Sequence, residues 1–595
     1  MFSKKIDLQI KQLIFLATDV DLRVEETSEF TKERCRMPVS NKGLGIRELE
    51  DRRHSEFIGG TVQGISKLLD RKDSSGAIIK GRIKSPSLIA WLGESSFDVD
   101  NADPWRCLMS KDSRIGNAIH ESWTHMSQDF RATCARVGTP PEEGCVLMNG
   151  SERAGFDHDG SVLFGSVTRK LTSDLEAARF NLLKKSVEKK TQDGSLYEPT
   201  PRERLVFNST DIFSSQPITA LPCPIGIMPD DSFVETFATY LGTPSPAMRA
   251  FTLDPTRPYF IGRSGREQKV DIYGDVVARA EVRGGDFRRS HDELKILLNG
   301  MLKHAGFYTT LEARNMFQGK IDARYLDSYC TQHSSVNAII PDILIHNYKN
   351  ANAGNSRTAC LPAIIDVKTL RVDKNQTMYT PGVHGGRTIK KAVEKKSDQV
   401  RTDYKTRVGK LDDKFAPNNQ HKPFATAYAN TFATGGVMPV IFGAFGEINK
   451  HTHRLVINCA KHAAADRDNS DITPEDVASA KGSPYNLILS QFRRALGCLA
   501  MRTAADEKLR KIMLIRSSKF EANQAAQNAT SNHRRKFNPR SPGWYDNFRN
   551  ETFHDTFYRY RTTYDNFSYA GDMIIFHVLV IICRNSTRQV SCTRT

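Results

Sequence analysis

Apolar residues along the chain follow two spacings, which predict helices in some stretches and strands in others. Between residues 111 and 136, large apolar side chains recur at three- and four-residue steps, the spacing of one buried helix face. A second amphipathic helix is predicted from about Ser173. Prolines crowd residues 191–230, which predicts an irregular connection and a boundary between two parts of the chain.

The region from 286 to 515 has the strongest pattern. An amphipathic helix, three strand-like runs, a basic helix, a further apolar strand and a closing helix follow one another, at residues 290–304, 307–312, 338–345, 363–370, 387–408, 437–445 and 486–499. The second and third runs are almost continuously apolar, which is typical of strands buried on both faces of a sheet. The order predicts an α/β (α+β) fold with a central mixed sheet flanked by helices, preceded by a mainly helical, partly irregular N-terminal region.

The same patterns divide the chain into five regions. We expect an irregular, partly flexible region, a helical region, a connecting region, the sheet-containing core and a basic-aromatic tail, at residues 1–110, 111–200, 201–285, 286–515 and 516–595. In the tail, arginines interleave with aromatic residues, a composition that can stack on single-stranded nucleic acid. A packed aromatic segment or a disordered tail fits the same composition.

Two acidic residues interrupt the apolar strands of the core. Asp342 lies in the run 338–345, and Asp366 lies in the next run, two residues before Lys368. An ionised carboxylate in such a run is costly unless it is paired or binds a metal. Residues two apart on a strand share one face, so Asp366 and Lys368 point the same way, and Asp342 joins them if the two strands pair. Two converging carboxylates make an oxygen site suited to Mg²⁺ or Mn²⁺, and a nearby lysine can stabilise charge on a phosphate.

A purely structural interpretation of these residues stays open. Asp342 could cap a turn after Pro341, and Asp366 and Lys368 could form an ordinary ion pair. Glu293, in the helix before the strands, has two interpretations as well. It could complete a capping box with Ser290, or it could act as an outer metal ligand or as a carboxylate that positions water.

The charge of the chain adds a candidate partner. The chain of 595 residues carries 85 Lys and Arg against 68 Asp and Glu, a formal net charge of +17. This balance favours a polyanion such as nucleic acid or an anionic membrane surface. The helix at 387–408 concentrates basic residues on one face, where contacts with a phosphate backbone are expected from Lys391, Lys395, Gln399, Arg401, Tyr404 and Lys405. A solvated helix face is the alternative interpretation.

Several classes of protein do not fit the sequence. The 11 cysteines include no C-x-x-C pair, which argues against a zinc ribbon or a disulfide framework and fits a reducing compartment. The apolar run from Met573 to Cys583 is well short of the ~20 residues that a membrane helix needs. No secretory signal is evident near the first residues. These features predict an intracellular protein, and the charge favours the nucleus.

The motif elements of the core are Glu293, Pro341-Asp342 and Asp366-Val367-Lys368. In this pattern the chain resembles the PD-(D/E)XK, or restriction-endonuclease-like, superfamily, whose core runs helix, three strands, helix, strand. The resemblance implies a nuclease in which these residues bind Mg²⁺ and activate water, with Lys368 in the electrostatic role. DNA is the expected substrate ahead of RNA. The alternative is an inactive nuclease fold that serves as a nucleic-acid-binding or assembly module.

A looser resemblance spans residues 170 to 515. It is to the region found after the reverse transcriptase in some eukaryotic retroelement open reading frames, which implies a retroelement origin. Those regions often carry Gly-Asp-His and Arg-His where this chain has Gly274-Asp275-Val276 and Ser290-His291. They also often carry an upstream Cys/His metal cluster that this chain lacks. No Tyr/Phe-x-Asp-Asp polymerase motif is present, so the chain is not itself a reverse transcriptase.

Overall fold

The computed structural model divides the chain into two compact units. It describes residues 2–18, 20–23, 27–46, 49–69, 114–138, 167–188, 196–219, 228–249, 259–261, 267–280, 288–314, 316–325, 339–350, 360–372, 391–467, 473–480 and 483–516. One unit comprises Met1–Leu16 and Asp21–Thr200, and the other comprises Ala17–Val20 and Pro201–Thr595. The expected tail from residue 517 onward, with its apolar run at 573–583, lies outside the described residues. The finer division into five regions stays a prediction.

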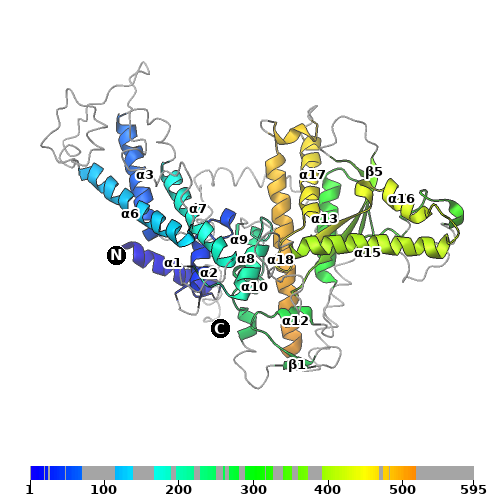
Figure 1. The fold of residues 1–595 in the computed structure, drawn as a ribbon, viewed down its shortest axis with the longest axis horizontal. Coiled ribbons are helices and arrows are strands. Elements are labelled where there is room, and N and C mark those ends of the chain that lie inside the picture. The colour runs from blue at the N-terminus through cyan, green and yellow to red at the C-terminus, as the bar shows by residue number, and fades with distance from the viewer. Residues whose placement is uncertain are drawn as a thin grey trace, which may run out of the picture. The chain divides into compact units, whose positions relative to one another are not determined.

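Helices make up the described part of the first unit (Figure 1). They are α1 (Phe2–Thr18, which ends in the second unit), α2 (Glu29–Arg36), α3 (Leu49–Leu69), α6 (Arg114–Val137) and α7 (Val167–Glu188). Helices α3, α6 and α7 pack against one another. The predicted helix at 111–136 is α6, and its apolar stripe is buried as expected. Helix α7 begins at Val167, so Ser173 lies inside it rather than at its start.

The second unit combines helices with a small sheet. Its helices are α8 (Pro201–Ser209), α9 (Gln216–Thr219), α10 (Asp230–Leu241), α12 (Asp275–Arg279), α13 (Arg289–His304), α15 (Ala392–Phe415), α16 (Pro423–Thr431), α17 (Lys450–Arg467) and α18 (Tyr485–Arg516). Its strands are β1 (Tyr259–Ile261), β2 (Glu267–Lys269), β3 (Thr309–Leu311), β4 (Ile343–Tyr348), β5 (Leu361–Thr369) and β6 (Val437–Phe442). Helix α10 packs against α8 and α18, and α12 packs against α18. Part of the expected connecting region thus forms one body with the core.

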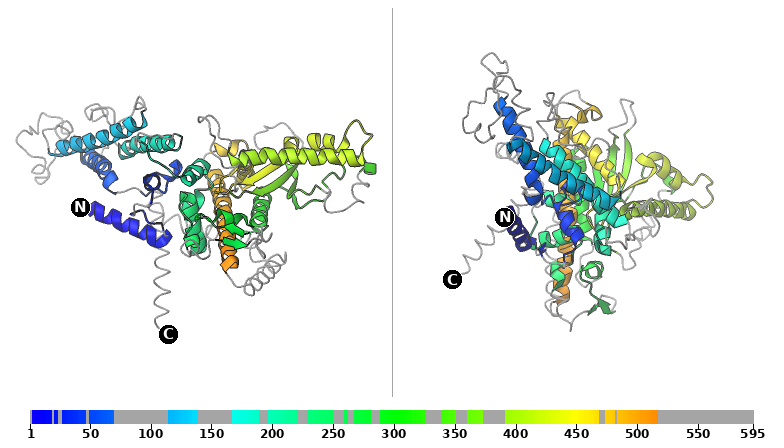
Figure 2. Two further views of the ribbon diagram at one scale, coloured as in Figure 1. Left: turned by 60° about the horizontal axis from the view of Figure 1, so that its bottom comes forward. Right: turned by 60° about the vertical axis from the view of Figure 1, so that its left-hand side comes forward.

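The predicted mixed sheet is present, with strand order β3-β4-β5-β6. Strands β3, β4 and β5 are antiparallel, with Ile343 opposite Ile365, and β6 runs parallel to β5. One face of the sheet packs on α13, α17 and α18, and the other packs on α15 and α16. Figure 2 shows α15 lying along the sheet. The expected burial of both faces of β4 and β5 is therefore confirmed in this coarse architecture.

Two further element boundaries in the second unit differ from the sequence prediction for physical reasons. Strand β4 starts at Ile343, because Pro341 has no N–H to give to a neighbouring strand. The closing helix, expected at 486–499, extends as α18 to Arg516. Its second half lacks a clean apolar stripe but buries Glu507 and Lys511. No described helix is long and apolar enough to cross a membrane.

Candidate active site

The pairing of β4 with β5 brings together the three residues of the predicted site. Lys368 Nζ lies 2.7 Å from Asp366 Oδ2 and 4.0 Å from Asp342 Oδ2. Asp366 and Lys368 share the face of β5 that is turned toward α15, and Asp342 directly precedes β4. The ammonium group of Lys368 therefore lies between two carboxylates that are 24 residues apart in the sequence. This convergence was the geometric condition for the nuclease interpretation.

The Asp342 carboxylate is held by two hydrogen-bond partners and by the charge of the more distant Lys368. Its Oδ2 accepts a hydrogen bond from the Val367 N–H at 2.6 Å and lies 3.2 Å from His291 Nε2. Burial raises the pKa of Asp342, but His291, Lys368 and the Val367 N–H together outweigh it and hold the pKa below its usual value. Asp342 is therefore ionised at neutral pH, in one fixed orientation.

The Asp366 carboxylate is buried, and its two oxygens have different partners. The Tyr404 hydroxyl on α15 donates to Oδ1 at 3.0 Å, and Lys368 faces Oδ2. Burial raises the pKa of Asp366, and Lys368 and Tyr404 only partly compensate. Because an ionised carboxylate is costly at this position, a bound cation would be stabilising here.

His291 is the residue of this site that the sequence analysis did not assign. Its ring bridges two carboxylates, with Nε2 at Asp342 and Nδ1 lying 3.1 Å from Asp292 Oδ1. The contacts with Asp292 and then Asp342 raise the pKa of His291 to about 9. A positional signal existed: His291 lies three residues before Leu294, so it shares the buried face of α13. Lys295 Nζ continues this network, because it lies 3.0 Å from Asp292 Oδ1 and 2.6 Å from Glu312 Oε1, directly after β3.

Glu293 has partners other than the predicted ones. Glu293 pairs with Arg289 at 2.7 Å and lies 3.5 Å from Arg502. It does not cap the helix with Ser290, because the Ser290 hydroxyl instead faces Glu507 and the Thr503 carbonyl in α18. The N-cap of α13 is the preceding Arg288, without a side-chain cap. No recorded contact joins Glu293 to either aspartate among the residues that the structure describes.

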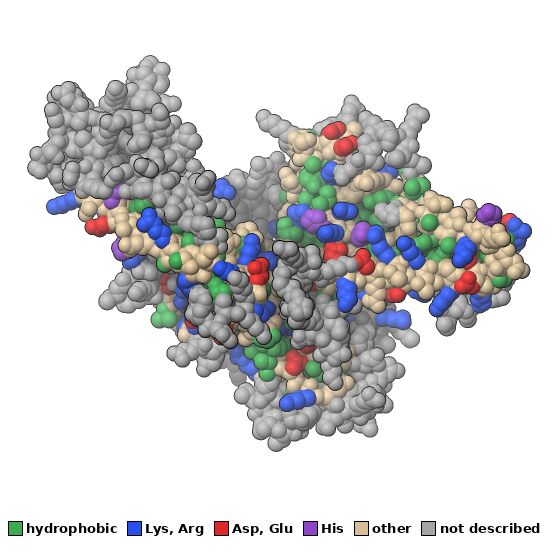
Figure 3. Space-filling view, in the orientation of Figure 1, with side chains coloured by type: hydrophobic (Ala, Val, Ile, Leu, Met, Phe, Trp, Pro, Cys, Tyr) green, Lys and Arg blue, Asp and Glu red, His purple; other side chains and the backbone are tan. Residues whose placement is uncertain are grey.

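The basic helix is present, although its start differs from the prediction. Helix α15 begins at Ala392, and the expected turn at 387–390 lies outside the described residues. Lys391, Lys395 and Lys405 are exposed, and Arg401 is half-buried. Figure 3 shows Lys and Arg side chains distributed along α15. Gln399 is exposed and accepts a hydrogen bond from Lys396, whereas Tyr404 is buried. Tyr404 is thus placed to orient Asp366 rather than to meet a substrate.

The donor set can be compared with what a divalent cation needs. Within the described ranges, no group of three or more His, Cys, Asp or Glu side chains is placed to bind a metal. Asp342 and Asp366 nevertheless already surround one cation, the Lys368 ammonium. Mg²⁺ commonly takes only one or two protein carboxylates and keeps several waters. The two aspartates therefore fit Mg²⁺ or Mn²⁺ as a two-carboxylate site.

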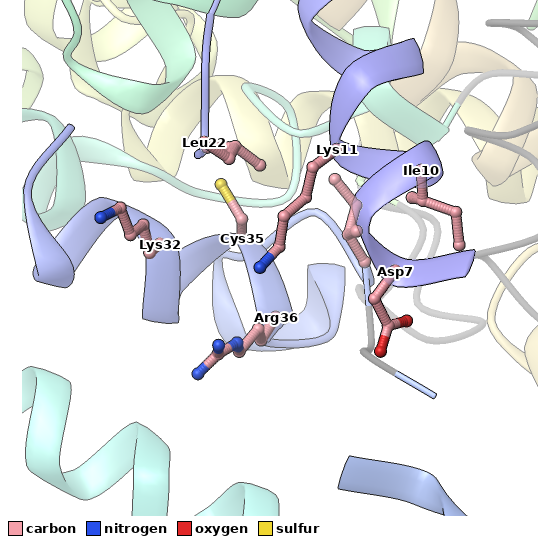
Figure 4. A pocket seen from close by; sticks show the side chains of 8 residues that line it. Asp7, Ile10, Lys11, Leu22, Lys32, Cys35 and Arg36 are labelled. Carbon is pink, nitrogen blue, oxygen red and sulfur yellow. The ribbon is translucent and has the colours of Figure 1, made fainter. Parts of the chain in front are cut away.

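A cavity in the first unit offers no comparable chemistry (Figure 4). Its lining mixes apolar and basic side chains with one acid, namely Asp7, Ile10, Lys11, Leu22, Lys32, Cys35, Arg36 and Ile46. Asp7 is already engaged, because it accepts a hydrogen bond from the Leu49 N–H at 2.8 Å. The cavity volume of about 20 Å³ is enough for one or two waters. The candidate active site is therefore the one at β4 and β5.

No family model and no curated protein matches this chain. Its function is consequently inferred from the geometry of its own residues.

Proposed function

We propose that the chain is a metal-dependent nuclease that hydrolyses phosphodiester bonds of nucleic acid, with a restriction-endonuclease-like core. The observation that carries this proposal is the convergence of Asp342, Asp366 and Lys368 at one end of the β4–β5 pair. The order α13, three strands, α15 and β6 supports it, because this is the order of elements in that superfamily. A retroelement origin, DNA as the substrate and a nuclear location belong to the same proposal.

Each residue of the site has a role that follows from its contacts. Asp342 and Asp366 would hold Mg²⁺ or Mn²⁺, which would supply Lewis acidity and lower the pKa of a bound water. Lys368, with 40% of its side chain exposed, can reach outward and stabilise negative charge on the phosphate. Tyr404 fixes Asp366, and His291 fixes Asp342. The exposed cations of α15 would bind the backbone of the substrate without reading its sequence.

One observation favours the alternative of an inactive nuclease fold. Both carboxylates already have cationic partners, Lys368 for Asp366 and the protonated His291 for Asp342. In a binding or assembly module, these pairs would simply neutralise buried charge. The two functions differ in one respect, which is whether a divalent cation binds to the two carboxylates and permits hydrolysis.

Cleavage assays distinguish these functions. Supercoiled plasmid, linear duplex and single-stranded oligonucleotides would be incubated with the protein in Mg²⁺, in Mn²⁺ and in EDTA. We expect cleavage that needs the metal and is lost in the Asp342→Asn variant, with duplex DNA cut ahead of single strands or RNA. Equal cleavage by the wild type and the variant would assign the activity to a contaminant, and binding without cleavage in either metal would favour the inactive module.

Replacing His291 should weaken metal use without unfolding the protein. In His291→Gln, Asp342 loses its bridge to Asp292, and such outer partners are worth about 10–100-fold in metal affinity or activity. We therefore expect the Mg²⁺ concentration for half-maximal cleavage to rise about tenfold. His346→Gln is the matched control, because His346 is exposed on the same sheet. An unchanged Mg²⁺ requirement in His291→Gln would remove His291 from the site.

A further inference from the structure

A cluster of basic side chains lies where three helices of the second unit meet. We call it the basic face; it comprises Lys391 and Arg401 from the α15 segment, His451, His453 and Arg454 from α17, and Arg493 from α18. Figure 3 shows His side chains beside Lys and Arg side chains where α17 meets the start of α15. Hydrogen bonds hold the start of α17 against α15, and α17 packs on α18. Glu394 accepts from the Lys450 N–H at 2.7 Å, and Asn449 donates to the Ser397 hydroxyl at 3.1 Å.

The first turn of α17 carries charge of the unfavourable sign. It reads Lys-His-Thr-His-Arg from residue 450 and contains no acidic residue. The start of a helix carries the positive end of its dipole, where cations are disfavoured. Local rules of this kind are commonly broken at functional sites. An anionic partner would relieve this repulsion.

The two histidines lie among other cations. Burial and the cations Arg401 and Arg454 lower the pKa of His451, and Glu394 is the acid that opposes them among the described residues. Glu394 is already engaged by the Lys450 N–H. The histidine is therefore mainly neutral at pH 7, and a phosphate beside it would favour its protonated form.

His453 has similar surroundings on the other side of the same turn. It faces Arg493 and Lys391, with Asp211 as the opposing acid, and burial and the two cations lower its pKa. Asp211 is engaged, since its carboxylate accepts hydrogen bonds from the N–H groups of three residues, Phe213, Ser214 and Ile448. The four Lys and Arg side chains of the basic face outnumber these two acids, so the surface keeps a net positive charge.

The basic face continues from the candidate active site. Arg401 lies on α15 three residues before Tyr404, whose hydroxyl donates a hydrogen bond to Asp366 Oδ1 at 3.0 Å. We propose that the basic face is a docking surface for the phosphate backbone of nucleic acid, and that His451 and His453 take up protons when the backbone binds. This inference rests on the proposed function for the choice of partner, because an anionic membrane surface offers the same charge.

Binding measurements without catalysis test this inference. The Asp366→Asn protein, in EDTA, would be titrated into a labelled 30-base-pair duplex and followed by fluorescence anisotropy over a salt series. We expect Arg401→Gln/Arg454→Gln to raise the Kd about tenfold and to lower the salt slope by about two, one for each phosphate contact. Arg454→Gln alone, at an exposed position, should give about a threefold change. The control Lys303→Gln/Lys269→Gln removes the same charge from exposed sites elsewhere.

The proton uptake is tested in the same assay. The Asp366→Asn protein should bind the duplex more tightly at pH 6 than at pH 8. The same protein with His451→Gln/His453→Gln added should bind with little pH dependence. An unchanged Kd and salt slope in the double arginine variant would overturn the inference, as would binding to phosphatidylserine vesicles in place of the duplex. If the wild type binds through this face but never cleaves, the proposed hydrolysis fails and the docking surface stands. If cleavage persists while the arginine variant binds normally, only the docking surface fails.

Discussion

The Asp366→Asn variant is expected to lose at least about a thousandfold in cleavage rate while it stays folded and binds nucleic acid. Asn is nearly the same size as Asp but carries no charge, so the site loses half of its anionic donor set for Mg²⁺. The basic face and the exposed lysines of α15 are unchanged. Single-turnover cleavage of a labelled duplex and anisotropy binding, measured on the same preparations, check the two halves of this prediction.

The same variant should be as stable as the wild type, or more stable, when no metal is present. The folded-state pKa of Asp366 is raised, mainly by burial, so its ionised form costs folding free energy at neutral pH. Neutral Asn avoids this cost, and Lys368 is exposed enough to turn to solvent. The stability advantage of the variant should shrink as the pH falls toward 3.8, the ordinary pKa of Asp. In the folded wild type Asp366 is protonated at a higher pH than in the unfolded chain, which removes the cost of its buried charge. Thermal unfolding between pH 4 and pH 7 measures it.

Added Mg²⁺ provides the decisive comparison. A ligand that binds only the folded state raises the midpoint of unfolding, so the Tm of the wild type should increase with Mg²⁺ and that of Asp366→Asn should not. Asp398→Asn is the matched control, since Asp398 is exposed on α15. Equal Mg²⁺ effects on the wild type and Asp366→Asn would show that the metal, if it binds, does so elsewhere.

Sequence patterns predicted the core well where one local rule determined the structure. The apolar runs around Asp342 and Asp366 became paired strands, because only a sheet interior buries both faces of such a run. Because side chains alternate between the two faces of a strand, residues two apart share a face, which placed Asp366 and Lys368 together. The pairing of the strands was not determined by either run alone, since it depends on which residues lie opposite one another.

The rest of the site depends on contacts between distant segments. His291 is assigned only when the start of α13 is seen against Asp342, 51 residues later. The periodic pattern drew attention to Glu293 instead, whose partners Arg289 and Arg502 lie on α13 and α18. Tyr404 was expected to face the substrate, but it lies on the apolar stripe of α15 with Val400 and Val408, and its hydroxyl reaches Asp366. Periodicity gives the face of a helix and does not give its partner.

The second half of α18 is an example of buried charge that no apolar pattern reveals. Glu507, with 4% of its side chain exposed, lies between Arg371 and the fully buried Lys511. Lys511 Nζ is 2.8 Å from Glu507 Oε1, and Glu507 Oε2 also accepts from the Ser290 hydroxyl at 3.1 Å. The cluster thus ties α18 to the residue next to His291 in α13. The cluster therefore stabilises the fold and also holds in place the part of α13 that carries His291.

Replacing Glu507 with Gln should therefore be strongly destabilising. The change leaves Arg371 and Lys511 without their shared carboxylate, and removing one partner of a buried ion pair typically costs about 3–5 kcal/mol. Urea unfolding at pH 7 measures this loss of unfolding free energy. Glu475→Gln, at an exposed position, is the control, for which we expect almost no loss.

The pH dependence of that loss identifies its cause. The pKa of Lys511 is already lowered from 10.5, chiefly by burial, and losing Glu507 would lower it further. The unfolded variant then binds more protons than the folded variant, so its stability should rise with pH, and the gap from the wild type should narrow toward pH 10. A gap that stays constant across this range would mean that packing, rather than the unpaired lysine, accounts for the loss.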